Sequence, residues 1–113
     1  MHPDAENFVT VSAWHAYFYT PKAADQTNPL AWPYHATLEE LKGLPPHILA
    51  MDELDPLRDE GIAYARKLVE AGVKAKGHVN LGVGHGTGLF MRAVVPEYWE
   101  SAVRDVSGFA KSL

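Results

Sequence analysis

The distribution of apolar residues changes at about Pro46. Upstream, residues 4–19 carry large apolar side chains at a spacing closer to helical than to alternating, and Asp4 can cap such a helix. Residues 19–46 lose this periodicity and contain five prolines, which indicates an extended connector. Inside the connector, Thr37 precedes the run LEEL and predicts one short capped helical turn. The first part of the chain is therefore expected to be an aromatic-rich helix followed by a connector.

After the connector the pattern becomes regular. Residues 47–51, HILAM, form a short apolar run between prolines and acidic residues, as expected of a buried strand. Residues 58–71 repeat apolar side chains at helical spacing and are closed by Gly72. Residues 73–81 alternate weakly and predict a second strand, and residues 96–112 begin with proline and predict a final helix. Each helix is expected to bury one apolar stripe, namely Ile62, Ala65, Leu68 and Val69 in the first and Tyr98, Ala102, Val106 and Phe109 in the second.

The order strand, helix, strand, helix with short joints predicts the α/β class, with two parallel strands joined by a right-handed crossover. Two parallel strands alone leave unpaired edges and uncovered faces. We therefore expect the sheet to be completed by more polypeptide: the rest of a longer chain, a second copy of this chain, or another subunit.

Composition narrows the functional classes. The chain has 113 residues, 47% of them hydrophobic and 21% charged, which is typical of one globular domain. Its net charge of −4 and its scattered basic residues argue against nucleic-acid and membrane partners. The absence of cysteine excludes disulfides, thiolate zinc sites and cysteine nucleophiles. No secretion signal is recognisable at the start of the sequence, so we expect a cytoplasmic location, and no cofactor or metal is implied.

Two loops follow the two predicted strands. Asp52–Glu60 is rich in acids, and Gly82–Gly88 is a glycine-rich loop around His85. Ligands of open α/β sheets bind beyond the carboxyl ends of the strands, where both loops emerge. An acid from the first loop and the imidazole from the second can therefore meet, and a carboxylate on one ring nitrogen leaves the other as a general base.

The strings ELDPLRDEG (53–61) and YARKLVEAGV (64–73), with the Gly-His-Gly loop after them, resemble the C-terminal part of hormone-sensitive-lipase-like α/β-hydrolases. AWHAYFYTP (13–21) and RDVSGFA (104–110) extend the resemblance, so that residues 1–113 as a whole resemble the C-terminal part of one such domain. The division expected is a helix and connector over residues 1–46 and the last two strands and helices over residues 47–113.

The resemblance implies the acid and the base of a catalytic triad. Asp55 matches the triad acid and His85 the triad base, and the order acid then histidine fits this fold. The family's GxSxG nucleophile elbow and HGGG-type oxyanion loop do not occur in the sequence. Thr87-Gly88 also replaces the aromatic residue commonly found after the histidine. No nucleophile is assigned, because no serine has the required flanking glycines; the serines are Ser12, Ser101, Ser107 and Ser112.

The leading hypothesis is a carboxylic-ester hydrolase portion that supplies Asp55 and His85 and acts on a small ester. Two alternatives remain. The chain could be a non-catalytic truncated fragment that associates with itself, or a small standalone hydrolase with an unassigned nucleophile.

Other polar and aromatic residues have simpler interpretations. His47 and His78 are expected to be hydrogen-bonded structural residues, and a zinc site from His78, His85 and an acid has no supporting spacing. The remaining acids of the first loop, Asp52, Glu53, Asp59 and Glu60, are expected to be solvated or to favour a helix dipole. An aromatic group could line an acyl pocket or pack in the core or an interface; it comprises Trp14, Tyr17, Phe18, Tyr19, Trp32 and Tyr34.

Overall fold

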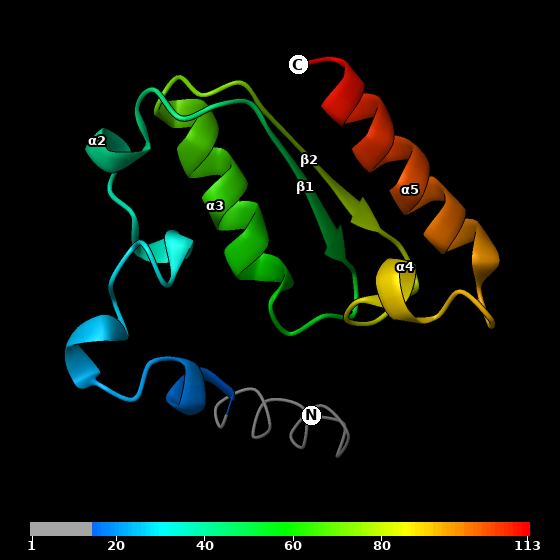
Figure 1. Ribbon diagram of the computed structural model, residues 1–113, viewed down its shortest axis with the longest axis horizontal. Helices are drawn as coiled ribbons and strands as arrows, with labels where there is room; N and C mark the ends of the chain where they lie inside the picture. The colour runs from blue at the N-terminus through cyan, green and yellow to red at the C-terminus, as the bar shows by residue number, and fades with distance from the viewer. Residues whose placement is uncertain (1–14) are drawn as a thin grey trace.

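The computed structural model describes residues 15–113. Most of the helix expected over residues 4–19 lies outside this range, but residues 15–19 are helical. The later elements follow the predicted order strand, helix, strand, helix (Figure 1). In chain order, the elements are η1 (Ala23–Asp25), η2 (Pro33–His35), α2 (Leu38–Leu41), β1 (His47–Asp52), α3 (Arg58–Glu70), β2 (Ala75–Asn80), α4 (Thr87–Phe90) and α5 (Pro96–Lys111).

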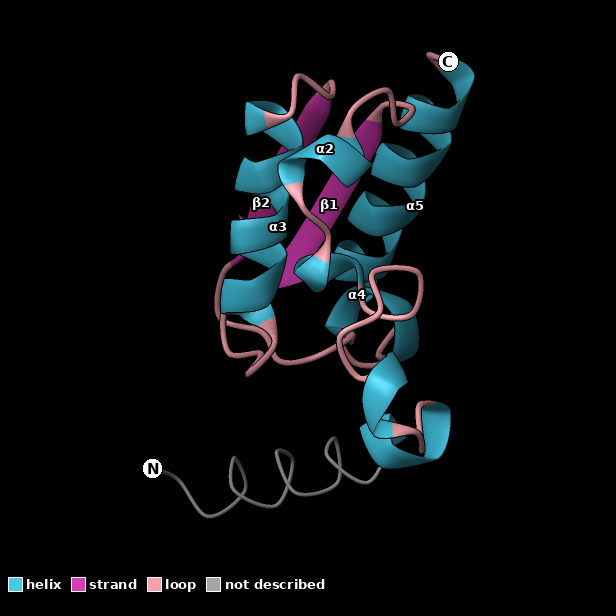
Figure 2. Cartoon of the chain, turned by 90° about the vertical axis from the view of Figure 1, so that its left-hand side faces the viewer, coloured by secondary structure: helices cyan, strands magenta, loops and turns pink. Residues whose placement is uncertain are grey.

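The connector is less extended than its prolines suggest. It contains the single 3-10 turns η1 and η2 before the short helix α2 (Figure 2). The predicted cap of α2 is confirmed, because the hydroxyl of Thr37 accepts from the backbone N–H of Glu40, and the Glu40 carboxylate accepts from the backbone N–H of Thr37 at 2.8 Å. The backbone N–H of Thr37 and, to a smaller extent, its hydroxyl, which donates to the same carboxylate oxygen at 2.9 Å, lower the pKa of Glu40.

The sheet consists of β1 and β2, which pair in parallel from His47 opposite Ala75 to Asp52 opposite Asn80. Side chains of a strand alternate between its two faces. Leu49 and Met51 therefore point to one face of β1, while Ile48 and Ala50 point to the other. The parallel pair confirms the α/β class.

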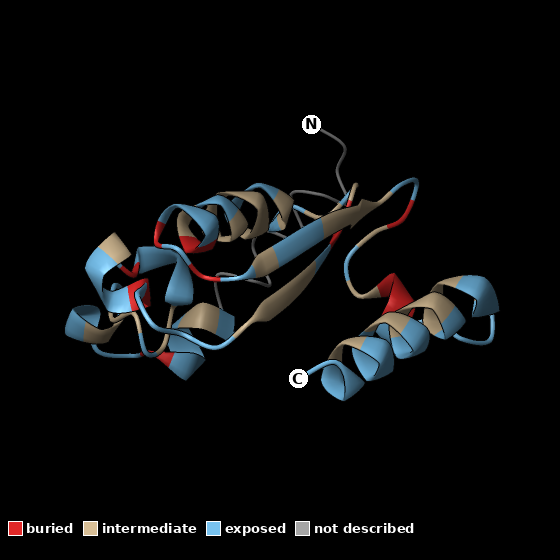
Figure 3. Cartoon of the chain, turned by 90° about the horizontal axis from the view of Figure 1, so that it is seen from above, coloured by how far each residue is buried: buried red, intermediate tan, exposed pale blue. Residues whose placement is uncertain are grey.

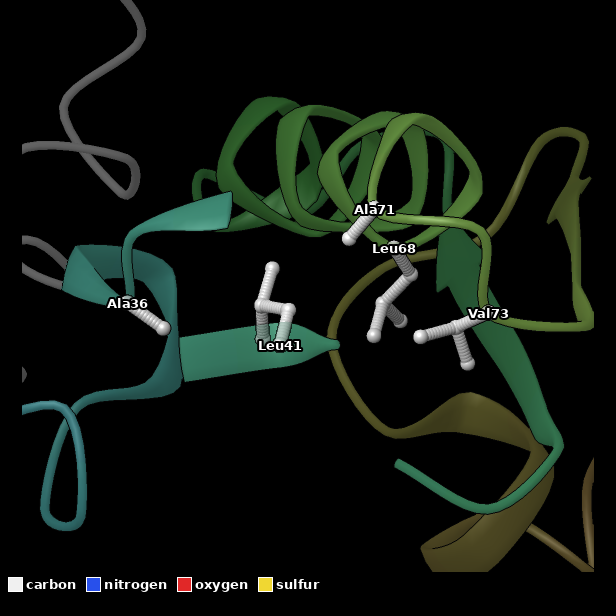
Figure 4. Close-up of a cluster of buried hydrophobic side chains, with 5 residues drawn as sticks. All are labelled: Ala36, Leu41, Leu68, Ala71 and Val73. Atoms are coloured by element: carbon white, nitrogen blue, oxygen red, sulfur yellow. The ribbon is translucent and has the colours of Figure 1, made fainter. Parts of the chain in front are cut away.

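Helix α3 covers the first face and forms the core with the segments around it. Leu68 is completely enclosed, and it clusters with buried residues from α2 and from the turn after α3 (Figure 4). Gly72 adopts a positive φ of 83°, which lets the chain turn back from α3 toward β2. One expectation was wrong: Val69 is 60% exposed. Helical periodicity placed it on the stripe, but it lines an open cavity between α3 and β2.

Helix α5 lies on the opposite side of the strands from α3 (Figures 1 and 3). A cavity of about 500 Å³ separates Ile48 and Ala50 of β1 from Ala102 and Val106 of α5. The expectation that Val106 points into a core was wrong, because it is 60% exposed. Ala50 is exposed as well. Within residues 15–113, no helix is long and apolar enough to cross a bilayer.

Candidate active site

Asp55 and His85, the two residues singled out in the sequence, meet beyond the carboxyl ends of β1 and β2. The Nδ1 atom of His85 donates to the Oδ2 atom of Asp55 at 2.8 Å. The Asp55 side chain is 12% exposed and the His85 side chain 44% exposed. A carboxylate can only accept, so the bond fixes the proton on Nδ1 and gives the lone pair of the neutral ring to Nε2.

The other oxygen of Asp55 shapes the loop that carries it. Oδ1 accepts from the backbone N–H of Leu57 at 2.8 Å, and the carbonyl of Asp55 accepts from the N–H of Arg58 at 3.0 Å. Such local bonds are the reason that aspartate favours turns before helices. Asp55 therefore turns the chain into α3 with one oxygen and holds His85 with the other.

Three cross-links hold the acidic loop against the histidine loop. The Asn80 amide donates to Oδ1 of Asp52 at 2.9 Å. The backbone N–H of Gly82 donates to a Glu53 carboxylate oxygen at 2.6 Å. The backbone N–H of Leu54 donates to the Val83 carbonyl at 3.0 Å. The expectation that Asp52 and Glu53 are solvated was wrong, since Asp52 is buried and Glu53 is half-buried. Their partners come from the next strand and its loop, which composition alone does not identify.

The histidine loop ends earlier than the glycine pattern indicated, because helix α4 begins at Thr87. The N-cap of α4 is Gly86, whose positive φ of 70° disfavours other residues. A Cβ atom at position 86 would also lie 2.6 Å from the Phe90 ring. The Thr87 hydroxyl donates to the Gly84 carbonyl at 2.7 Å, closing the loop around His85. Both glycines serve the tight turn that presents the imidazole.

A cavity of about 980 Å³ opens beside His85 and is walled mainly by the connector and α3. Of the aromatic group noted in the sequence, four members line it, Phe18 is 73% exposed and Trp14 lies outside the described residues. Lining this cavity is compatible with a pocket wall, while Tyr17 and Tyr19 are more than half exposed, so the choice between pocket and interface stays a prediction. The aromatic lining residues are Tyr17, Tyr19, Trp32, Tyr34 and Tyr64.

The serines of the described residues lie on α5 or directly after it. The Ser101 hydroxyl accepts from Arg104, and the Ser107 and Ser112 hydroxyls donate to backbone carbonyls of α5. Ser12 lies outside the described residues. Ser101 lines the cavity under α5 that also reaches Asp55 and His85, but it has no glycine-flanked turn of the kind that presents a nucleophile, so none is assigned.

Among residues 15–113, the other histidines and acids have contacts of a structural kind. His47 bonds the Pro45 carbonyl at 2.7 Å, in line with a structural role, while His78 lies on β2 beside the cavity under α5. Asp59 pairs with Arg58, raising the pKa of that guanidinium, and Glu60 lies at the edge of the aromatic cavity. No three His, Asp or Glu side chains within residues 15–113 form a metal-binding group.

Comparisons with known proteins identify the fold to which these elements belong. A family model described as the alpha/beta hydrolase fold matches residues 4–89. The solved structure of brefeldin A esterase, described as a bacterial homologue of human hormone sensitive lipase, is 51% identical with a TM-score of 0.80, over 83% of this chain and 26% of that chain. Esterase Est22 is 40% identical with a TM-score of 0.77, and the match covers 82% of this chain and 27% of Est22.

Curated relatives point the same way. Esterase LipI of Mycobacterium tuberculosis is 35% identical, and the match covers 89% of this chain and 30% of LipI. An arylesterase of Saccharolobus solfataricus is 47% identical, and the match covers 49% of this chain and 17% of the arylesterase. The chain therefore spans between about a sixth and a third of the length of these relatives. The resemblance to hormone-sensitive-lipase-like hydrolases is confirmed. Because the family model covers most of the sequence, the chain belongs to the α/β-hydrolase fold family.

Proposed function

We propose that this chain supplies the acid Asp55 and the base His85 of a Ser-His-Asp triad in a carboxylic-ester hydrolase. The observation that carries the proposal is the 2.8 Å bond between His85 Nδ1 and Asp55 Oδ2 at the carboxyl ends of two parallel strands. Esterases among the relatives support the reaction class. The nucleophilic serine comes from polypeptide that provides the GxSxG elbow missing from this sequence.

The bond to Asp55 gives His85 the tautomer that the reaction requires. As the serine oxygen attacks the ester carbonyl, a new C–O bond forms and the serine proton moves to Nε2 of His85. Asp55 stabilises the resulting imidazolium through Nδ1. His85 then gives the proton to the departing alcohol oxygen, leaving an acyl-enzyme.

A second cycle of the same groups releases the acid. His85 removes a proton from a water molecule that attacks the acyl carbonyl, and returns this proton to the serine oxygen as the acyl bond breaks. The half-exposed position of His85 lets both water and substrate approach it. The cross-links of Asp52 and Glu53 keep the Asp55 loop in position throughout.

The test is reconstitution of activity from two polypeptides. The 113-residue chain is mixed with the complementary N-terminal portion of brefeldin A esterase, which the chain matches over 26% of its length, and p-nitrophenyl acetate hydrolysis is measured. We expect His85→Ala to lower kcat by about 1,000-fold or more and Asp55→Asn by a comparable factor, since triad members act as a unit.

The matched control is His47→Ala, which removes another strand-associated imidazole at the opposite end of β1. It should leave kcat within about threefold of the unmodified complex, as expected for a residue outside the site. Equal losses from His47→Ala and His85→Ala would overturn the assignment. So would His85-dependent turnover by the 113-residue chain alone, because the nucleophile would then lie within it.

We further propose that the partner of this chain completes the sheet next to β1. In residues 15–113, β1 pairs only with β2, and its residue Ala50 is exposed. A second copy of the chain could occupy the same edge as a non-catalytic assembly. Light scattering distinguishes the two: a dimer that persists when the complementary portion is added would favour self-association, and replacement of the dimer by a mixed complex would favour the hydrolase assembly.

A further inference from the structure

Trp32 and His85 line the same cavity, although they belong to distant parts of the sequence. The cavity of about 980 Å³ runs from the indole of Trp32, on the connector, to the imidazole of His85, beyond β2. A group bound against Trp32 would therefore lie in the same space as the candidate base. This continuity makes the wall of the cavity a determinant of which esters reach His85.

The orientation of Trp32 is fixed by a buried hydroxyl. Its indole N–H donates to the Thr20 hydroxyl oxygen at 3.0 Å, and Thr20 is only 5% exposed. The same hydroxyl donates its proton to the carbonyl of Ala16 at 3.1 Å. Because both hydrogen bonds of Thr20 are directional, the threonine holds the indole plane in one orientation.

Two further contacts join this wall to its neighbours, one of them through Tyr19, which is itself 64% exposed. The ring of Tyr19 meets Trp32 edge to face, with 5.4 Å between the centroids and 85° between the planes. The Lys67 ammonium of α3 donates to the carbonyls of Tyr34 and Ala36 at 2.7 and 2.9 Å. These bonds of Lys67 connect the connector wall to α3, which begins three residues after Asp55.

We propose that this wall binds an uncharged aryl group of the ester, with Trp32 as a specificity-determining residue and Thr20 as its positioning residue. The proposal rests on the function proposed above and names its substrate class. An aryl ring can add an edge-to-face contact to the pair of Trp32 and Tyr19, which an alkyl ring of the same size cannot. The carboxylate of Glu60 at the cavity edge disfavours an anionic group there.

The experiment measures binding rather than turnover. The full 113-residue chain is titrated with phenyl acetate and, separately, with cyclohexyl acetate, while NMR follows the indole N–H of Trp32 and the ring protons of His85. Trp99 supplies an internal reference indole. Its ring centroid lies 4.1 Å from Cζ of Arg92, in the segment before α5. We expect the signals of Trp32 and His85 to shift while that of Trp99 stays, with phenyl acetate preferred about fivefold.

Variants separate recognition from folding. Trp32→Ala should abolish the preference for phenyl over cyclohexyl acetate, as followed at His85, whereas Trp99→Ala should preserve it. Thr20→Val, which removes the hydroxyl at nearly constant volume, should reduce the preference to about twofold, and Thr20→Ser should restore it. This rescue would not follow if Thr20 served stability alone.

Three results would overturn the inference: unmoved Trp32 and His85 signals, equal shifts of the Trp32 and Trp99 indoles, or a preference that survives Trp32→Ala. The reconstitution assay reads out the proposed function independently. Aryl binding without His85-dependent turnover would contradict that function, and turnover without aryl preference would contradict only this inference.

Discussion

Helices α3 and α5 face the same two strands from opposite sides, yet only α3 encloses a core. Leu68 of α3 is fully buried, whereas no residue of α5 is, even though α5 separates its apolar and polar residues more sharply. The cavity under α5 accounts for the difference. An apolar stripe therefore shows which face of a helix is suited to burial, while the neighbouring elements decide whether that face is covered.

The largest expected difference between the two sides comes from deleting apolar side chains. Leu68→Ala should lower the free energy of unfolding by about 3 kcal/mol, because it removes enclosed methyl groups and leaves a cavity. Val106→Ala on α5 should lower it by less than about 0.5 kcal/mol. Urea unfolding followed by circular dichroism measures both. Similar losses at the two positions would mean that α5 is packed against the strands in solution.

The helical glycines provide a second, smaller contrast. A Cβ atom at Gly61 of α3 would lie 2.8 Å from Cγ of Met51, whereas one at Gly108 of α5 would meet nothing within 4 Å. Gly61→Ala should therefore destabilise the chain by about 1 kcal/mol, as overpacking exceeds the gain in helix propensity. Gly108→Ala should stabilise it by about 0.5 to 1 kcal/mol. Opposite signs in thermal unfolding would support the contrast, and equal signs would remove it.

The smallest effect concerns the cap of α2 on the α3 side. The folded-state pKa of Glu40 lies below its ordinary value because Thr37 donates to the carboxylate. A depressed pKa contributes stability that is present above the unfolded-state pKa and is lost as the pH falls through the folded-state pKa. Glu40→Gln should therefore flatten the acid side of the stability–pH curve in urea unfolding between pH 7 and pH 3.

The control for this prediction is Glu39→Gln. Glu39 is the neighbouring acid and pairs with exposed Lys42 rather than with the cap. The Glu39→Gln variant should leave the shape of the stability–pH curve nearly unchanged. An equal flattening by both variants would show that general charge, and not the cap, produces the pH dependence.

The succession of elements could be predicted because strong local signals mark it. The two prolines before β1, Gly72 after α3 and Pro96 at the start of α5 all act within a few residues of the boundaries that they set. The meeting of Asp55 and His85 was also expected, from strand topology and from the resemblance. Their catalytic roles stay a prediction until they are assayed.

The missed features depend on contacts between distant residues. Nothing in the acidic string distinguishes Asp52, which is buried against Asn80, from its exposed neighbour Asp59. The helical turn from Thr87 was hidden by glycines, whose flexibility makes a loop the simpler prediction. The hydrogen bond between Trp32 and Thr20 likewise joins residues with no shared periodicity. Pairings of this kind become visible only in three dimensions.

The unstaggered pairing of β1 and β2 makes chain length itself a constraint. Asp52 and Asn80 end the two strands opposite each other. Asp55 lies three residues after Asp52, and His85 lies five residues after Asn80. Inserting or deleting one residue in either strand would displace a loop by roughly 3.3 Å and exchange the two faces of the sheet. Related sequences should therefore vary in length within the connector before β1, and keep both of these short spans constant.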